Sequence, residues 1–484
     1  MEGTRALAAG FPLEPSMTTA ASAPAVPTVP VVASSRPHIF TLAWPLLIEL
    51  FLAVAIGVIG TALAARMSDA AGAAFAVASQ ISVTLFMLFR IIGSGIGVVI
   101  TQSLGGGHRA AADKVARAML GASTWLGAFT ALLTVGGAGW LMEIMQAPPD
   151  VRPLAQPFLQ MLAPAMLFDA WNAAMASVMR AHLRTRDTLV VLVAMHLSHL
   201  LLAVPLMQGW GPVPALGLSG FAIALALSRA LGLVLHLMLW RSHLAIFPIA
   251  SDWWRVQRRE LAAVLHIGIP AAAENLTWRL AFMASMAVAG LLGSQALATH
   301  AYVQQVCGVI VMFSLATGFA VEIMVGHMIG AGELRDAHKL VRSALGRSLL
   351  ISAVISGAVA LAGPWMLGWF TQDKDIIANG IVLLWLTVLL EVGRTFNLVV
   401  INALRAAGDV RYPVVAGAAS MVIVLGGGSW VLGIYCELGL VGVWLAYAAD
   451  EWIRGLMMWR RWSVHAWVPH ARAARRRLRG TAAN

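Results

Sequence analysis

The chain has 484 residues, of which 60% are hydrophobic and only 11% are charged, and it carries a net charge of +11 at pH 7. A soluble domain is typically about 25% charged, so a water-covered surface is excluded and lipid is expected to surround the protein. The apolar stretches are long and continuous. This excludes a β-barrel, whose strands alternate polar and apolar side chains over about ten residues.

Twelve apolar stretches follow one another, each long enough to cross a bilayer as a helix. They lie at residues 39–65, 70–104, 115–142, 154–179, 187–208 and 216–240 in the first half, and at 260–292, 296–329, 339–370, 376–404, 412–435 and 438–461 in the second. The sequence therefore predicts an all-α polytopic membrane protein with twelve transmembrane helices.

Polar segments divide these stretches into two six-helix lobes. The expected organisation is a disordered cytoplasmic tail (1–36), an N-terminal lobe (37–241), a cytoplasmic linker (242–259), a C-terminal lobe (260–462) and a basic cytoplasmic tail (463–484). The first tail is rich in Ala, Pro, Ser and Thr, and it has neither an apolar span nor the pattern of a signal peptide.

Basic residues are concentrated in every second loop. The alternate loops hold only Arg66, Arg152 and Lys374 of the basic set. By the positive-inside rule, we expect a multi-pass protein of a bacterial inner membrane with both termini in the cytoplasm. This distribution accounts for the positive charge without a nucleic-acid partner, and membrane lipids are the expected surroundings.

The two halves are copies of one unit. A shift of 225 positions aligns rare residues without a gap from Pro45 to Arg186. The matched pairs are Pro45 with Pro270, Glu49 with Glu274, Gln80 with Gln305, Gly105 with Gly330, Gly107 with Gly332, Lys114 with Lys339, Arg117 with Arg342, Asn172 with Asn397, Arg180 with Arg405, and Arg186 with Arg411. Internal duplication in an apolar chain is typical of transporters. An even number of spans per half predicts parallel repeats, related by a pseudo-two-fold axis along the membrane normal.

Glu49 and Glu274 are the first candidates for proton coupling. Ionisable groups inside a membrane are costly and usually functional. Each glutamate stands one turn after a proline, Pro45 or Pro270, which permits a kink. We expect the two carboxyls to face each other across the axis, where a proton and a cationic substrate compete for them. The alternative is that each glutamate hydrogen-bonds a carbonyl that its proline leaves free.

Asp169 is a third candidate for proton coupling, and five further polar residues are candidates for lining a cavity. These five are Asn172, Arg279, Glu391, Arg394 and Asn397. Glu391 and Arg394 are three residues apart on one helix, so they are expected to neutralise each other. Arg279 is a possible partner for Glu274. Two other arginines at depth, Arg90 and Arg229, have no predicted role.

Sequence motifs for catalysis are absent. The chain has no G-x-x-x-x-G-K-[ST] phosphate loop, no H-E-x-x-H pair and no G-x-S-x-G turn in a strand–helix setting. Cys307 and Cys436 lie in apolar context and suggest neither a disulfide nor a metal site. We therefore predict no enzyme, no catalytic residue and no cofactor, and expect an ion gradient to supply the energy.

Four segments together resemble the MATE multidrug and toxin extrusion transporters. They are residues 42–50 (LAWPLLIEL), 102–107 (QSLGGG), 325–332 (VGHMIGAG) and 403–413 (ALRAAGDVRYP). The resemblance covers about residues 38–462. It implies twelve helices in two lobes around a V-shaped central cavity, and export of cationic amphiphilic compounds in exchange for protons or sodium ions.

Three positions depart from that family's pattern. Gly60 stands where many members carry an Asp late in the first span, Arg394 stands where they carry an Asp in the tenth, and the acid of the seventh span falls near Trp278. The family's coupling carboxylates are therefore not carried over, and Glu49, Asp169, Glu274 and Glu391 would have to serve. A sodium site is less favoured beside an arginine, so protons are the preferred coupling ion.

The sequence leaves two functions open. The first is a monomeric secondary antiporter that exports small amphiphilic, mostly cationic molecules by alternating access. The second is a flippase for lipid-linked oligosaccharides or lipid precursors, for which the cationic residues Arg90, Arg279 and Arg394 would suit an anionic pyrophosphate. A membrane enzyme would need a catalytic cluster or a sizeable soluble domain, and the sequence has neither.

Overall fold

The computed structural model describes residues 37–210 and 214–482, with side chains up to residue 478. Within this part every regular element is a helix and no strand is present. The tail predicted to be disordered, residues 1–36, lies outside the described residues. The predicted all-α fold is confirmed.

The helices of the first lobe follow the first six predicted spans. They are α1 (Ile39–Ala65), α2 (Asp69–Gly105), α3 (Arg109–Gly136), α4 (Ala138–Ile144), α5 (Arg152–Met161), α6 (Ala163–Ala181), α7 (Thr185–Gln208) and α8 (Leu218–Leu239). The fourth predicted span is divided between α5 and α6 at Leu162. Pro164 explains the break, because proline lacks the backbone N–H that a continuous helix needs.

The second lobe repeats this order. Its elements are α9 (Arg258–Leu291), α10 (Ser294–Ala331), α11 (Leu334–Leu361), α12 (Gly363–Leu367), α13 (Lys374–Ala406), α14 (Arg411–Ser420), η3 (Met421–Gly427), α15 (Gly428–Trp430), η4 (Val431–Tyr435) and α16 (Gly439–Ser463). The offset of 225 places Leu389 where the first lobe has Pro164 (164 + 225 = 389), and α13 is accordingly continuous.

Nine of the described helical segments are long and apolar enough to cross a membrane, by length and composition alone. The other three predicted spans are also helical: α5 with α6, α9, and α16. All three carry charged side chains inside the span, which lowers their mean hydropathy.

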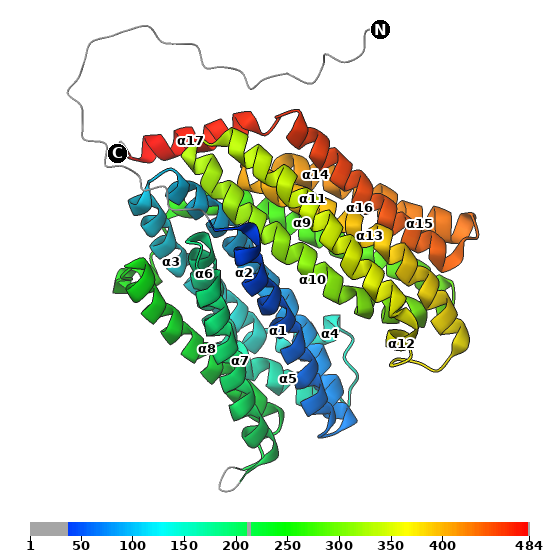
Figure 1. Ribbon diagram of the computed structural model, residues 1–484. Coiled ribbons are helices and arrows are strands. Elements are labelled where there is room, and N and C mark those ends of the chain that lie inside the picture. The colour runs from blue at the N-terminus through cyan, green and yellow to red at the C-terminus, as the bar shows by residue number, and fades with distance from the viewer. Residues whose placement is uncertain (1–36, 211–213, 483–484) are drawn as a thin grey trace, which may run out of the picture. The chain divides into compact units, whose positions relative to one another are not determined.

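The linker between the lobes packs on the first lobe. It contains two short turns, η1 (Trp240–Leu244) and η2 (Ala250–Trp253). The ring of Trp253 lies edge-on against Trp171 of α6, with 5.2 Å between the centroids, and Trp125 of α3 donates to the Trp254 carbonyl at 2.9 Å. The basic tail forms a further helix, α17 (Val468–Ala482), which contacts both α2 and α10 (Figure 1).

The two lobes meet through their first two helices. The first helix of each lobe packs against the second helix of the other, α1 on α10 and α9 on α2, and α2 also packs on α10. In Figure 1 the blue α1 and α2 lie beside the yellow-green α10. The predicted two-fold relation between the repeats is therefore visible in how the lobes contact each other.

Candidate functional site

Glu49 and Glu274 each form an ion pair with an arginine of their own lobe. In the first lobe, Glu49 Oε2 lies 3.2 Å from Arg180 Nη1, and the second oxygen accepts from the Thr188 hydroxyl. In the second lobe, Glu274 Oε2 lies 2.7 Å from Arg405 Nη2. We expected the two carboxylates to face each other, and the structure instead pairs each one within its own lobe.

Both arginines occupy the last turn of their helices, α6 and α13. Arg279 was a possible partner for Glu274, and the structure corrects this, because Arg405 holds that place. Sequence reasoning assigned Arg180 and Arg405 to loops and so missed them as partners. Their match in the repeat, at the same offset as Glu49 and Glu274, was the signal that identifies them.

Two more charged residues interact electrostatically with these ion pairs. Glu322 of α10 is 8% exposed, and its Oε1 lies 3.9 Å from where a Cβ of Gly97 on α2 would be. These two positions are equivalent in the repeat (97 + 225 = 322), so Glu322 stands close to the pseudo-two-fold axis. Arg90 of α2 is exposed, and its charge attracts Glu322 and repels Arg180 and Arg405.

We call the set formed by Glu49, Arg90, Arg180, Glu274, Glu322 and Arg405 the central charge cluster. It joins three carboxyl groups to three guanidinium groups, so it is neutral when all six are ionised. Residues of both lobes contribute to it, and Arg90 and Glu322 link the two ion pairs through their charges. Such a cluster accepts one added positive charge more readily than two, because like charges repel strongly where water is scarce.

Asp169 belongs to a separate polar group inside the first lobe. Its carboxylate lies 2.8 Å from Arg229 Nε on α8. Asn172 donates to the Arg229 carbonyl at 2.9 Å, and its amide oxygen lies 3.0 Å from His236 Nδ1. Arg229, which had no predicted role, therefore neutralises Asp169, and this pair is expected to stabilise the contact between α6 and α8.

The second lobe contains a larger buried network. Its members are Glu391, Arg394, Asn397, Asp450, Glu451 and Arg454. The predicted pair of Glu391 and Arg394 is present, with 2.5 Å between Oε1 and Nη1, and Arg394 also binds Glu451 at 3.2 Å. Arg454 binds Asp450 at 2.6 Å and Glu451 at 2.9 Å.

This network has one more carboxyl group than guanidinium groups. Its three acids, Glu391, Asp450 and Glu451, face two arginines. Glu391 is fully buried, and its Oε2 has no hydrogen-bond partner among the residues that the structure describes. A bare carboxylate oxygen in the interior is costly, so the network is a place where one proton can be kept.

The positions of the family's acids are filled by other groups. A Cβ at Gly60 would lie 2.6 Å from Phe75 Cζ and 3.2 Å from the Phe221 ring, so no carboxylate fits there. Trp278 stacks on Phe282 with 5.4 Å between centroids, and Arg394 lies in the network described above. In the described part of the chain, no group of three or more His, Cys, Asp or Glu side chains is arranged to hold a metal ion.

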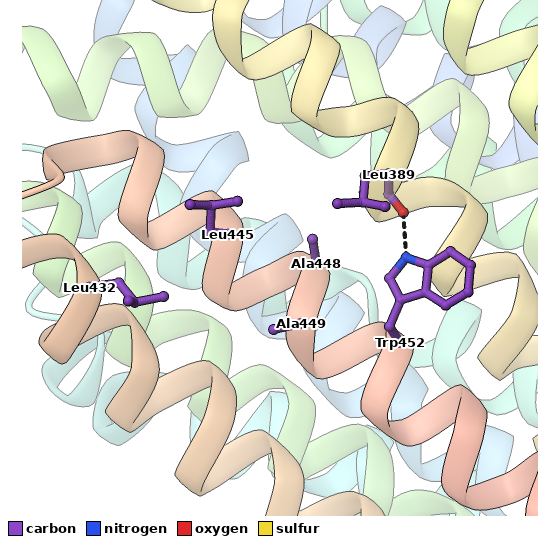
Figure 2. A pocket seen from close by; sticks show the side chains of 6 residues that line it. All are labelled: Leu389, Leu432, Leu445, Ala448, Ala449 and Trp452. Atoms are coloured by element: carbon purple, nitrogen blue, oxygen red, sulfur yellow. Dashed lines mark hydrogen bonds between the residues drawn. The ribbon is translucent and has the colours of Figure 1, made fainter.

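An apolar groove of about 570 Å³ lies elsewhere in the second lobe, between α13, η4 and α16 (Figure 2). Its lining residues are Leu389, Leu432, Leu445, Ala448, Ala449 and Trp452. The Trp452 indole donates to the Leu389 carbonyl at 2.9 Å, as the dashed line in Figure 2 marks. None of these lining residues is charged, so the groove offers no counter-charge for a cation.

Comparisons with known proteins agree with this architecture. A sequence model of the family described as MatE matches residues 45–204 and 270–428, two segments that begin 225 positions apart (270 − 45 = 225). The chain is 30% identical over 430 residues to the uncharacterized transporter YisQ of Bacillus subtilis. This alignment covers 89% of this chain and 94% of YisQ.

Two further likenesses are more distant. A probable multidrug resistance protein NorM of Rhodopseudomonas palustris is 26% identical over 441 residues, 87% of this chain and 90% of that protein. A crystal structure of MATE in the bent conformation matches with a TM-score of 0.81 at 17% identity, covering 90% of this chain and 96% of that one. At that identity the likeness concerns the fold, which is two bundles of six spans.

Proposed function

The chain belongs to the MatE family of transporters, and from this premise we propose that it is a secondary antiporter. It exports small amphiphilic, mostly cationic compounds across the bacterial inner membrane in exchange for protons. Multidrug efflux is the activity that the names of its NorM relatives suggest. Two parallel lobes that share a site at their junction are the architecture that alternating access requires.

The observation that carries this proposal is the neutrality of the central charge cluster. A proton on Glu49 or Glu274 gives the cluster a charge of +1, and so does a bound organic cation. Both together would give +2, and two unit charges about 4 Å apart repel by about 4 kcal/mol at an effective dielectric of 20. Proton and substrate therefore displace each other, which is the exchange that an antiporter performs.

Protons suit this site better than sodium ions. Each carboxylate is already bound by a guanidinium at 2.7–3.2 Å, and a proton can take the place of that partner on one oxygen. A sodium ion needs several oxygen ligands at once, and the arginines stand where such ligands would be needed. Asp169 of the first lobe, which is bound by Arg229, is a further candidate for binding the coupled proton.

The basic loops favour a cytoplasmic position for both termini. The ends of α2 and α10, which carry those loops, would then face the cytoplasm. α17 contacts α2 and α10, with Arg475 beside Gly332 at the end of α10. Its arginines Arg472, Arg475 and Arg476 would then suit anionic lipid headgroups. The chain is proposed to work as a monomer, since each lobe supplies one half of the central charge cluster.

A liposome experiment tests the proposal. The purified protein is reconstituted with a pH-sensitive dye inside the liposomes, and ethidium is added outside. Proton movement opposite to ethidium, dependent on the protein and unaffected by sodium, is the expected result. If ethidium and a panel of other organic cations move no protons in either direction, proton-coupled cation export is wrong.

One observation favours the flippase as a second candidate. The Arg90 guanidinium lies within electrostatic range of those of Arg180 and Arg405, and three such groups would suit a pyrophosphate. Arg394, in contrast, already forms ion pairs with Glu391 and Glu451 inside the second lobe. Protein-dependent transfer of a fluorescent pyrophosphate-linked lipid between leaflets, without any cation–proton exchange, would move the assignment to this candidate.

A further inference from the structure

Two side chains donate hydrogen bonds across the junction of the lobes. Gln102 Nε2 of α2 donates to the Ala406 carbonyl at the end of α13. His327 Nε2 of α10 donates to the Ala181 carbonyl at the end of α6. Both distances are 2.8 Å. The two bonds are equivalent in the repeat, since 102 + 225 = 327 and 181 + 225 = 406, although one donor is an amide and the other an imidazole.

The acceptors are carbonyls that their own helices leave free. α6 ends in a turn in which Arg184 N donates to Met179 O and Leu183 N donates to Arg180 O. This leaves the carbonyl of Ala181 without an intrahelical donor, as helix ends generally do. α13 ends with the same pattern around Ala406. Each cross-lobe bond therefore supplies a donor that a buried helix end needs.

The backbones of α2 and α10 are in close contact at this level. A Cβ at Gly105 would collide with the His327 carbonyl, and a Cβ at Gly330 would collide with the Gln102 carbonyl. Only glycine permits such an approach. The ends of α2 and α10 are thus held against each other, and α17 contacts both helices (Figure 1).

Each acceptor carbonyl directly follows an arginine of the central charge cluster. Arg180 precedes Ala181, and Arg405 precedes Ala406. The ion pairs with Glu49 and Glu274 therefore fix the helix ends that present the two carbonyls. Loss of an ion pair releases the arginine and the last turn of its helix together, because the arginine and the acceptor residue are adjacent in the chain.

We propose that Gln102 and His327 are gate residues, and that Arg180 and Arg405 position their acceptors. The gate holds the lobes together at the ends of α2 and α10. Protonation of Glu49 or Glu274 frees the arginine that is paired with it and weakens the gate; this step rests on the proposed function. The protonated transporter then opens at this end, and the deprotonated one closes there.

The repeat supplies its own conservative variant for a test. Because glutamine makes the equivalent bond at position 102, His327→Gln is expected to keep the bond, and His327→Ala removes it. Gln102→Ala removes the other bond. Gln160→Ala is a matched control, since Gln160 donates to the Val135 carbonyl at 3.0 Å within the first lobe only.

Spin labels at Ala110→Cys and Asp336→Cys report the separation of the lobes, because both positions are exposed in the first turns of α3 and α11. The background replaces Cys307 and Cys436. We expect His327→Ala and Gln102→Ala each to increase the population at longer distance at least twofold, and the double variant to increase it further. His327→Gln and Gln160→Ala should match the parent protein.

A second experiment tests whether protonation of Glu49 weakens the gate. Glu49→Gln, a mimic of the protonated carboxyl, should raise the long-distance population in the parent and have less effect in the double variant, where the gate is already broken. Unchanged distances in both alanine variants, or opening by His327→Gln equal to that of His327→Ala, would overturn the gate. Failure of cation–proton exchange in liposomes, with these distance changes intact, would overturn only the proposed function.

Discussion

Arg405 and Glu274, 131 residues apart, form the same ion pair in the second lobe that Arg180 and Glu49 form in the first. The duplication has kept both partners, although the surroundings differ. Glu49 also accepts from Thr188, while the equivalent position in the second lobe is Pro413 (188 + 225 = 413), which has no hydroxyl. The two carboxylates are therefore held by different sets of hydrogen bonds.

The ion pair of the second lobe can be tested through stability. Arg405→Met leaves the 11%-exposed Glu274 carboxylate without its partner, and breaking a buried pair in this way costs about 3–5 kcal/mol. The double variant Arg405→Met with Glu274→Gln removes both charges and should recover most of that loss. Thermal unfolding in detergent measures both. A double variant as unstable as Arg405→Met alone would show that the pairing is not what matters there.

The excess carboxyl group of the second-lobe network predicts an asymmetry between two substitutions. Glu391→Gln removes one negative charge from a network that has one too many, and its Oε2 gives up no hydrogen bond. We expect a change in unfolding free energy of less than about 1 kcal/mol, within the range of a single hydrogen bond.

Arg394→Met is the counterpart in the same network. It leaves Glu391 and Glu451 without a shared partner, and a loss of about 3–5 kcal/mol is expected. Thermal unfolding of the two variants side by side checks the charge count. Equal losses would mean that all three carboxyl groups are ionised and equally needed.

Gly60 and Gly57 form a matched pair for testing why the family's acid is missing from α1. A methyl group at Gly60 would press on Phe75 and Phe221, whereas one at Gly57 would meet nothing within 4 Å. Overpacking typically costs about 1–3 kcal/mol, while alanine at an open helical site gains up to about 1 kcal/mol over glycine. Gly60→Ala should therefore lower the melting temperature and Gly57→Ala should not. A Gly60→Ala variant as stable as the parent would show that the aromatic rings do not keep a side chain from this position.

The spans, the lobes and the repeat could be predicted because they depend on local properties. Long apolar runs define helices in lipid, and a constant offset of 225 aligns the lobes without any knowledge of contacts. The break between α5 and α6 could also have been anticipated, since Pro164 has no counterpart at Leu389. Boundaries agree within two residues except for the third and ninth spans. There α3 begins at Arg109 and α11 at Leu334, and the predicted ends lie beyond breaks that separate α4 from α3 and α12 from α11.

The partners of the charged residues could not be predicted in the same way. Glu274 and Arg405 are far apart in sequence, and only the tertiary fold brings their side chains together, from α9 and from the end of α13. Arg279 is much closer to Glu274 in sequence, but Arg405 forms the ion pair with Glu274. Glu391 and Arg394 were predicted correctly because three residues on one helix fix their distance, whereas the part played by Glu451 depends on the contact between α13 and α16.

The gate between the lobes likewise depends on contacts between residues that are far apart in sequence. Nothing in the sequence shows that Gln102 reaches Ala406, because an amide near the end of a span is unremarkable by itself. The glycines at 105 and 330 did stand out in the repeat, and the structure explains them by the close approach of α2 and α10.

The most direct test of the account compares proton movement by the parent protein, Glu49→Gln and Glu274→Gln in the same liposomes, driven by an ethidium gradient. Glutamine is neutral and close in size to the protonated side chain, so each variant holds the central charge cluster at +1. Both variants should bind ethidium more weakly than the parent and lose at least tenfold in ethidium-driven proton flux. If both variants carry protons as fast as the parent, the central charge cluster does not couple proton and substrate, and the mechanism proposed for this transporter is wrong.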